Sequence, residues 1–470
     1  MRRRGAVTLA LPLVWLVAAT PGAQAPHVTR VERPSTSWLD QYREPAARLI
    51  GEAVGSTFAW QRLAVLTDSI GHRLSGTPSL DRAIAWAVDE MKRDGLENVH
   101  TESVMVPKWV RGAESAEIVE PARHAMVMLG LGDSVGTGPG AEGIQADVIV
   151  VRSFEELEAN PDRARGRIVL FNVPFTSYGE TVRYRSQGPS RAARHGAVAA
   201  LVRAVGPAGL RTPHTGALQY ATDAPKIPAA AIATEDADRL QRMTDRGSRI
   251  VVRLKMEAHF EADATSANVV GELRGREKPE EIVVVSGHLD SWDVGAGATD
   301  DGGGCIVTWE ALRIMKKLNL RPRRTLRVVL WTNEENGGRG GLAYRDQHRA
   351  ELGNHVLMME SDGGVFRPLG FGFSGNDTAR EKVKAIATLL TSIAAEQVSL
   401  GGGGADIGPS IQEAHIPGMS LEVDGSKYFL IHHTPADTID KIDPIEMAKC
   451  AAAIAVMAYV VADLPQRISQ

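Results

Sequence analysis

One glycine-rich stretch, residues 286–304, constrains the fold of this chain more than any other. It reads SGHLDSWDVGAGATDDGGG and follows an apolar, β-branched run at 281–285 that predicts a buried strand. An apolar helical pattern resumes at Cys305. The stretch therefore predicts a strand that ends in a loop of polar side chains, which is where an open α/β sheet places its chemistry.

Strand-like and helix-like segments alternate regularly from this stretch to the C-terminal end. The predicted strands are 281–285, 325–330, 355–359 and 418–421, and the predicted helices are 304–318, 339–351, 380–397 and 444–464. Such alternation is typical of a doubly wound sheet that is mostly parallel and lies between two layers of helices. We therefore predict a three-layer α/β/α architecture.

Residues 109–259 differ from the segments on either side in their predicted secondary structure and in their content of Gly, Pro and Arg. The chain before them predicts helices at 44–56, 58–70 and 80–94 and a strand at 99–106. Within 109–259, short strand candidates at 147–151, 167–171, 197–202 and 227–232 lie among Gly, Pro and Arg residues. We predict that 109–259 is an inserted β-rich domain, called the insert below, and that 26–108 and 260–470 together form the main domain.

Charge and cysteine content exclude several kinds of function. The formal net charge of −4 shows no basic excess, so nucleic acid is not expected as a partner. The two cysteines, Cys305 and Cys450, lie in apolar helix-like sequence, which favours buried thiols over a disulfide. Charged residues closely flank the apolar part of the helix at 444–464, which predicts a core helix and not a membrane span.

The N-terminal residues 1–25 predict an export signal. Arginines at 2–4 precede an apolar run at 6–19, and the sequence PGAQA at 21–25 supplies an A-x-A cleavage pattern. The apolar run is shorter than the roughly 20 residues that cross a bilayer. We therefore expect an exported protein, periplasmic or secreted, without a stable membrane anchor after removal of the signal peptide.

Acidic and imidazole side chains follow all four strands predicted in the C-terminal part. They are His288, Asp290, Asp300, Glu334, Glu335, Asp362, His432 and His433. Because the carboxyl ends of parallel strands lie on one edge of a sheet, these side chains can meet in a single pocket.

Such a pocket requires cations. Arg339 is the one basic residue beside these motifs, and unneutralised buried carboxylates cost several kcal/mol each. Imidazole and carboxylate ligands favour Zn²⁺ over Mn²⁺ or Co²⁺ without excluding either. The ligand count suits two ions with one bridging carboxylate, and two ions about 3.5–4 Å apart can hydrolyse a bond through a bridging hydroxide.

The ordered motifs H-x-D, D-D-G-G-G, N-E-E, S-D-G-G and H-T-x-x-D-T resemble those of the co-catalytic zinc peptidases of the M28 family. The resemblance covers most of the mature chain and implies a zinc-aminopeptidase-like fold and hydrolase activity on small peptides. Several family members carry a protease-associated (PA) domain, to which the segments GRIVLF and IPAAAI in the insert are similar. A homodimer is also compatible with the resemblance.

The family motifs imply a ligand set for two zinc ions in this chain. Asp300 would bridge the ions, His288 and Asp362 would complete one site, and Glu335 and His433 would complete the other. Each ligand is carried over from the motif that contains it.

The remaining motif residues receive supporting roles from the same resemblance. Glu334 would be the general base, and Asp290 would orient the His288 imidazole. Asp406, after a run of glycines at 401–404, would lie next to the metal ligands without binding an ion itself. The peptide bond that follows Asp300 is cis in relatives.

The chain departs from some relatives at His432, where they have a tyrosine whose hydroxyl supports the tetrahedral intermediate. Two interpretations are open. His432 donates a hydrogen bond to the oxyanion, or it only packs beside the site. The other histidines near these motifs, His348 and His355, are expected at the surface or as capping residues.

The leading interpretation is therefore an exported di-zinc exopeptidase that cleaves dipeptides or small peptides. An aminopeptidase on longer peptides is the alternative. A single-zinc acyltransferase like the glutaminyl cyclases and a non-catalytic binding protein like transferrin receptor use the same scaffold, but the complete ligand set argues against both. The sequence does not decide which peptide terminus must be free.

Overall fold

The structure is a computed structural model that describes residues 37–138 and 142–469. The predicted export signal at 1–25 lies outside these residues. From Leu39 onward the chain forms one compact unit. Within it, two large sheets are connected through a short two-stranded ladder, β2 (Trp109–Val110) with β11 (His259–Phe260).

The larger sheet has eight strands in the order β1-β12-β14-β13-β15-β18-β16-β17. Their bounds are β1 Glu97–Val106, β12 Ala264–Leu273, β14 Arg324–Trp331, β13 Lys278–His288, β15 His355–Glu360, β18 Gly418–Val423, β16 Pro368–Ser374 and β17 Gln397–Leu400. The central strands β14, β13, β15 and β18 are mutually parallel. Strand β12 runs antiparallel to β1 and β14, whereas β16 is antiparallel to β18 and parallel to β17. The predicted parallel centre is confirmed, and the sheet is mixed at both edges.

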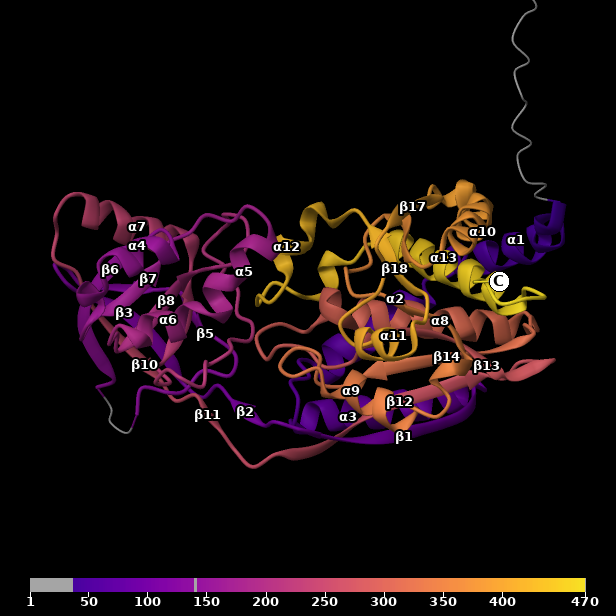
Figure 1. Cartoon of the computed structure of the whole chain (residues 1–470), viewed down its shortest axis with the longest axis horizontal. Helices are drawn as coiled ribbons and strands as arrows, with labels where there is room; N and C mark the ends of the chain where they lie inside the picture. The colour runs from indigo at the N-terminus through magenta and orange to yellow at the C-terminus, as the bar shows by residue number, and fades with distance from the viewer. Residues whose placement is uncertain (1–36, 139–141, 470) are drawn as a thin grey trace, which may run out of the picture. The chain divides into compact units, whose positions relative to one another are not determined.

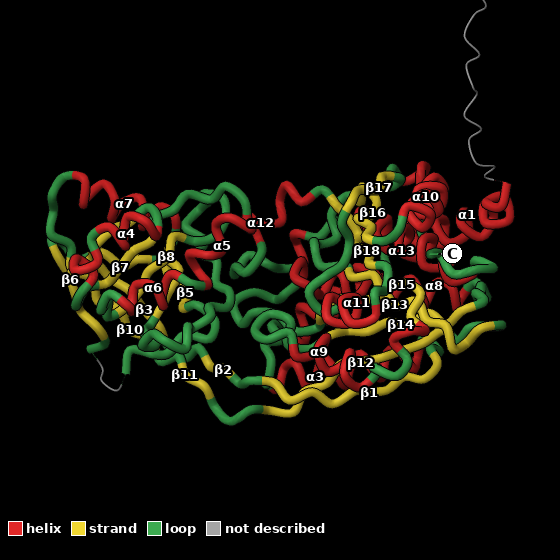
Figure 2. The backbone as a smooth tube through the Cα atoms, in the orientation of Figure 1, coloured by secondary structure: helices red, strands yellow, loops and turns green. Residues whose placement is uncertain are grey.

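Helices cover both faces of the larger sheet and complete the predicted three-layer architecture. One face carries α1 Asp40–Val54, α2 Phe58–Ala64, α3 Pro78–Arg93, α8 Gly303–Lys317, α10 Asp377–Ala387 and α13 Pro444–Asp463. The other carries α9 Arg339–Gln347 and α11 Gly408–Ala414, which pack on buried side chains of β13 and β14. Figure 2 shows the strands in yellow, with the helices packed around them.

Local sequence explains where the main helices begin. Thr77 accepts a hydrogen bond from the backbone of Leu80, and Asp443 does the same at the start of α13; a proline follows each cap. Helix α13 is apolar on all sides and long enough to cross a membrane by length and composition. It is buried in the fold, as expected for a core helix.

The helix expected at 380–397 is shorter than predicted. Helix α10 ends at Ala387, a 3-10 turn follows at Thr388–Ile393, and the chain then enters β17. The hydroxyl of Thr388 donates to the carbonyl of Ala385, and such local hydrogen bonds compete with helix continuation. Ala394 has a φ of 56°, which ends the turn.

All strands of the smaller sheet come from residues 114–256, inside the insert. Their order and bounds are β4 His124–Met126, β3 Glu114–Glu120, β10 Val251–Met256, β6 Ile144–Val151, β7 Ile168–Phe171, β8 Ala199–Arg203, β9 Ala229–Ile232 and β5 Met128–Gly130. Its helices are α4 Phe154–Ala159, α5 Tyr178–Ser186, α6 Gly188–Arg194 and α7 Thr234–Asp245, drawn in magenta tones in Figure 1. Each of the four strand candidates in the insert corresponds to one of β6 to β9.

Of the two roles expected for His348 and His355, surface or capping residue, the capping role is confirmed: His348 follows the last residue of α9 and His355 follows the 3-10 turn Leu352–Asn354. His355 does not lie at the surface. Its side chain is buried: Nε2 is 2.8 Å from the Tyr344 hydroxyl and Nδ1 is 3.2 Å from the carbonyl oxygen of Glu351. Burial lowers the pKa of His355 to about 4. His348 is half-buried and contacts Glu351 and Glu102, so both histidines belong to a polar network and not to the solvent-exposed surface.

Candidate metal centre

The parallel register aligns the strand ends that carry the candidate ligands. His288, the last residue of β13, lies opposite Trp331, the last residue of β14. Ser286 of β13 lies opposite Glu360, the last residue of β15. The loops that follow β14 and β15 therefore start level with His288.

Asp300 lies between two groups of candidate ligands. Its Oδ1 is 3.2 Å from Nε2 of His288, and that nitrogen is 3.4 Å from Oδ1 of Asp362. Its Oδ2 is 3.1 Å from Nε2 of His433, which in turn is 3.0 Å from Oε2 of Glu335. The two carboxylate oxygens of Asp300 thus face separate imidazoles, which is the geometry of a bridging ligand. The Asp300–Asp301 peptide bond is cis, as the resemblance implies.

Several features of this cluster fit metal ions. Asp300 Oδ2 is buried and, among the described residues, faces only the imidazoles of His433 at 3.1 Å and His432 at 3.5 Å. A cavity of about 10 Å³ lies against Asp300, Glu335 and His433. Three sets of donor atoms lie within 4.8 Å of one another: His288 with Asp300 and Glu335, Asp300 with His432 and His433, and His288 with Asp301 and Asp362. Imidazole nitrogen and carboxylate oxygen are donors that suit zinc.

The electrostatics of the cluster also favour cations. Burial raises the pKa of eight carboxyl groups in and behind it: Asp290, Asp301, Glu334, Glu335, Glu360, Asp362, Asp406 and Asp437. The pKa of Glu335 rises to about 7 and that of Asp437 to about 6. Burial also acts on Asp300, but hydrogen bonds to His288 and His433 outweigh it and hold the pKa of Asp300 well below its usual value. Without cations, keeping most of these buried carboxyl groups charged requires a large free energy.

The expectation that Arg339 is the neighbouring basic residue needs correction. Its side chain is exposed, whereas Arg73 and Arg185 are buried near the cluster. The guanidinium of Arg73 donates to backbone carbonyls, including those of Leu289 at 2.6 Å and Gly297 at 2.9 Å, and within residues 37–138 and 142–469 it forms no ion pair with a carboxylate. Both arginines lie far from the motifs in sequence, so local sequence gave no sign of them.

Asp290 supports the site differently from the way the resemblance implies. Nδ1 of His288 is 3.0 Å from the backbone carbonyl of Asp290 and 3.9 Å from its carboxylate. The carboxylate instead accepts from the backbone N–H groups of Glu334 at 3.1 Å and Glu335 at 3.3 Å. Its side chain therefore holds the loop that carries both glutamates, while its main chain orients the imidazole.

Asp406 is buried behind the ligands, and neither carboxylate oxygen has a hydrogen-bond donor. Burial raises its pKa well above the usual value, and the nearby Glu360 and Glu334 add to the shift. Glu360 accepts from the backbone of Ile407 at 3.0 Å. Among the described residues, Asp406 thus interacts with the cluster electrostatically, through Glu360 and Glu334, and not through a side-chain hydrogen bond.

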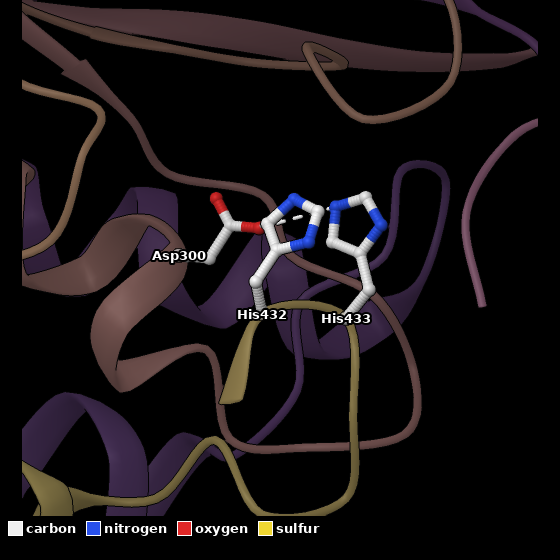
Figure 3. A group of neighbouring side chains, drawn as sticks. All are labelled: Asp300, His432 and His433. Atoms are coloured by element: carbon white, nitrogen blue, oxygen red, sulfur yellow. Dashed lines mark ion pairs between the residues drawn. The ribbon is translucent and has the colours of Figure 1, made fainter. Parts of the chain in front are cut away.

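His432 and His433 follow strand β18, as predicted, after an intervening segment at 424–431 that includes a short helix, α12 (Tyr428–Ile431). Their rings are stacked at 3.5 Å between centroids, and Nε2 of His432 is 3.5 Å from Asp300 Oδ2 (Figure 3). Nδ1 of His432 is buried without a partner. Burial and the neighbouring His433 hold the pKa of His432 well below its usual value, so its ring is neutral.

Two residues without a predicted role also belong to the site. The carboxylate of Asp437 accepts from the backbone N–H groups of Thr299 at 2.7 Å and Asp300 at 3.1 Å, which fixes the backbone at Asp300. Tyr428 lies one helical turn before His432, with ring centroids 5.0 Å apart. Burial and the surrounding carboxylates, Asp300 first, raise the pKa of Tyr428 well above its usual value and keep its hydroxyl protonated. The sequence places Asp437 in the last motif, H-T-x-x-D-T. For Tyr428 the only sequence feature that could have indicated a role is its spacing of four residues from His432.

The insert also reaches the site, although no site residue was predicted in it. Arg185 and Thr215 contact His433, and the ring of Tyr178 lies edge-on to His432 at 5.3 Å between centroids. These contacts join residues more than two hundred positions apart, which a single sequence does not reveal.

Residues 268–458 of the chain match Peptidase family M28. Carboxypeptidase Q from Mus musculus is 47% identical over 433 residues, which cover 92% of each chain. The crystal structure of a peptidase M28 precursor from Shewanella amazonensis SB2B has a TM-score of 0.86 and 34% identity and covers 91% of this chain and 98% of that one. BSAP, a zinc aminopeptidase from Bacillus subtilis, shares the fold at a TM-score of 0.64 and 19% identity, with 87% and 96% covered.

Proposed function

This chain belongs to peptidase family M28 and is a metallopeptidase, and from that premise we propose that it is an exported di-zinc exopeptidase acting on dipeptides or small peptides. The observation that carries the di-zinc part is the position of Asp300, whose two oxygens face His288 and His433 separately. Export is proposed from residues 1–25, and residues 109–259 are proposed to be the inserted PA-like domain. A homodimer stays a prediction.

The proposed ligands form two halves that share Asp300. His288 and Asp362 would hold one ion, and Glu335 and His433 would hold the other. Two zinc ions bound there would lower the pKa of a bound water to about 7 and would polarise the peptide carbonyl. Asp437 and Asp290 fix the backbone around the ligands, so the donor atoms are set before the metals arrive.

Glu334 is the proposed general base. Its carboxyl group is partly exposed, and burial together with the charge of Asp362 and Glu335 raises its pKa well above the usual value. A glutamate with a raised pKa can accept a proton from the attacking water and return it to the leaving amine near neutral pH. The hydrogen bond from its backbone N–H to Asp290 keeps it beside the ligands.

His432 is the proposed donor to the oxyanion, and Tyr428 is the second candidate for that role. Replacing His432 with alanine is expected to lower kcat about 10²–10³-fold with both zinc ions retained, because a preorganised donor is lost. Tyr428→Phe is the matched comparison, since it removes only a hydroxyl. Steady-state kinetics of both variants decide the assignment. An unchanged kcat in His432→Ala together with a reduced kcat in Tyr428→Phe gives the role to Tyr428.

The specificity of the enzyme is tested with one dipeptide in three forms: free, N-acetylated and C-amidated. We expect the purified zinc-loaded protein to release amine from the free dipeptide, and release to stop when a chelator removes the metal. Cleavage of the free form alone indicates a dipeptidase that binds both termini, and cleavage of the free and amidated forms indicates an aminopeptidase. Cleavage of the acetylated form indicates a carboxypeptidase. No cleavage of any form by the zinc-loaded protein contradicts the proposal and favours a binding protein.

A further inference from the structure

The insert forms hydrogen bonds with His433 at Nδ1 of its ring and at its backbone carbonyl. Its Nδ1 is 3.3 Å from the carbonyl oxygen of Thr215, and the N–H of Thr215 donates to the carbonyl of His433 at 3.0 Å. His433 has a φ of 60°, a left-handed conformation that costs a non-glycine residue about 1 kcal/mol or more. The reciprocal pair of hydrogen bonds therefore fixes both the ring and the strained backbone of this residue.

The contact with Thr215 also favours one tautomer of the His433 ring. Nδ1 lies 3.3 Å from the Thr215 carbonyl, which only accepts, and 3.5 Å from the Arg185 guanidinium, which only donates, so a proton on Nδ1 satisfies the shorter of the two contacts. Nε2 then keeps its lone pair and points it at Glu335 and Asp300. Histidines that bind metals commonly donate their other N–H to such an acceptor.

Arg185, from helix α5, holds Thr215 in place. Its side chain is buried, and its guanidinium donates to the Thr215 carbonyl at 3.1 Å and to the Tyr178 hydroxyl at 2.9 Å. The hydroxyl of Thr215 donates to the carbonyl of Gly130 at 2.7 Å. Thr215 is thus anchored through its main chain and its side chain, both inside the insert.

Gly216 makes this close approach possible. It has a φ of +128°, and a Cβ atom there would lie 2.3 Å from the guanidinium of Arg185 and 2.8 Å from Nδ1 of His433. A side chain at this position would push the insert away from the imidazole. The sequence thus leaves room for the contact at the point where the insert meets the ligand.

We propose that the insert is a working part of the metal centre: the Thr215 backbone, held by Arg185, sets the tautomer and position of His433 and thereby the affinity for the second zinc ion. Arg185 and Gly216 are positioning residues, since neither binds the metal. The inference rests on the proposed ligand set, in which His433 belongs to one half only. It predicts that a substitution which breaks the contact with the insert lowers the affinity for one ion and leaves the affinity for the other unchanged.

The test measures zinc per chain and the affinity of each ion by chelator competition. Arg185→Met and Gly216→Ala are each expected to weaken one ion about 10–100-fold, the usual effect of losing a partner behind a ligand, and to leave the other unchanged. Arg185→Lys, which can still donate to the Thr215 carbonyl, is expected to recover part of the loss. Two matched controls should bind both ions normally. Arg183→Met changes an exposed arginine on the same helix, and Gly247→Ala changes a glycine of the insert with a φ of +74° and open space around it.

His433→Ala separates failure of this inference from failure of the ligand set. If that variant binds both ions normally, the proposed ligand set is wrong. If it loses one ion while Arg185→Met and Gly216→Ala keep both at wild-type affinity, the role of the insert is wrong and the ligand set stands. Equal weakening of both ions also overturns the inference, because it indicates general destabilisation. Should Arg185→Met fail to fold, Gly216→Ala and Arg185→Lys decide the matter by the same measurement.

Discussion

Glu334→Gln is expected to lower kcat by about 10²–10⁴-fold while both zinc ions remain bound, because the amide keeps the shape of the side chain but cannot accept the proton. The pKa of Glu334 is raised, and its carboxylate accepts no hydrogen bond from the described residues; both observations agree with a role in proton transfer. Stopped assays on the free dipeptide, combined with metal analysis, give both readouts from one preparation.

The matched control for this change is Glu396→Gln, which makes the same substitution at an exposed position and should leave kcat and zinc content unchanged. Loss of one zinc ion from Glu334→Gln would reassign Glu334 as a ligand. Normal turnover with both ions present would remove it from the mechanism.

Asp300→Asn is expected to have the broadest effect of any single change, since the side chain takes part in both halves of the proposed site. The amide presents one oxygen instead of two and carries no charge, so it cannot bridge two cations. We expect both zinc affinities to fall at least about 10²-fold and dipeptide cleavage to disappear, as measured by chelator competition and amine release.

Asp377→Asn is the control for Asp300→Asn, because its carboxylate is exposed and lies in helix α10. Retention of one ion at wild-type affinity in Asp300→Asn would place this residue in a single half of the site. The bridging assignment would then have to move to another carboxylate.

The parts of the fold that could be predicted are those in which neighbouring residues carry the signal. The run at 282–285 is apolar and the run at 325–330 is mostly apolar because β13 and β14 are covered on both faces, and several proposed ligands come within a few residues of those strand ends. Strand β16 was missed because it begins with Pro368 and contains two glycines, which weaken a strand pattern.

The parts that could not be predicted depend on contacts between distant residues or on the choice between main chain and side chain. Thr215 and Arg185 stand 218 and 248 positions from His433, and no local pattern links them. The motif H-x-D places Asp290 beside His288 but does not show that the carbonyl, and not the carboxylate, binds the ring. The sequence allowed a capping role for His355, which the structure has, but the burial of its ring depends on packing against Tyr344 and could not be predicted.

The insert lies between β2 and β11 in the sequence, and this position sets the order in which the two large sheets are synthesised. Every strand of the smaller sheet ends by Met256, so that sheet is complete in the growing chain before β13 has been synthesised. The edge pair β1 and β12 spans the whole insert, and the last proposed ligand, His433, appears only near the end of synthesis. The residues of the insert that contact His433 are therefore synthesised before His433, and the proposed ligand set is complete only near the end of synthesis.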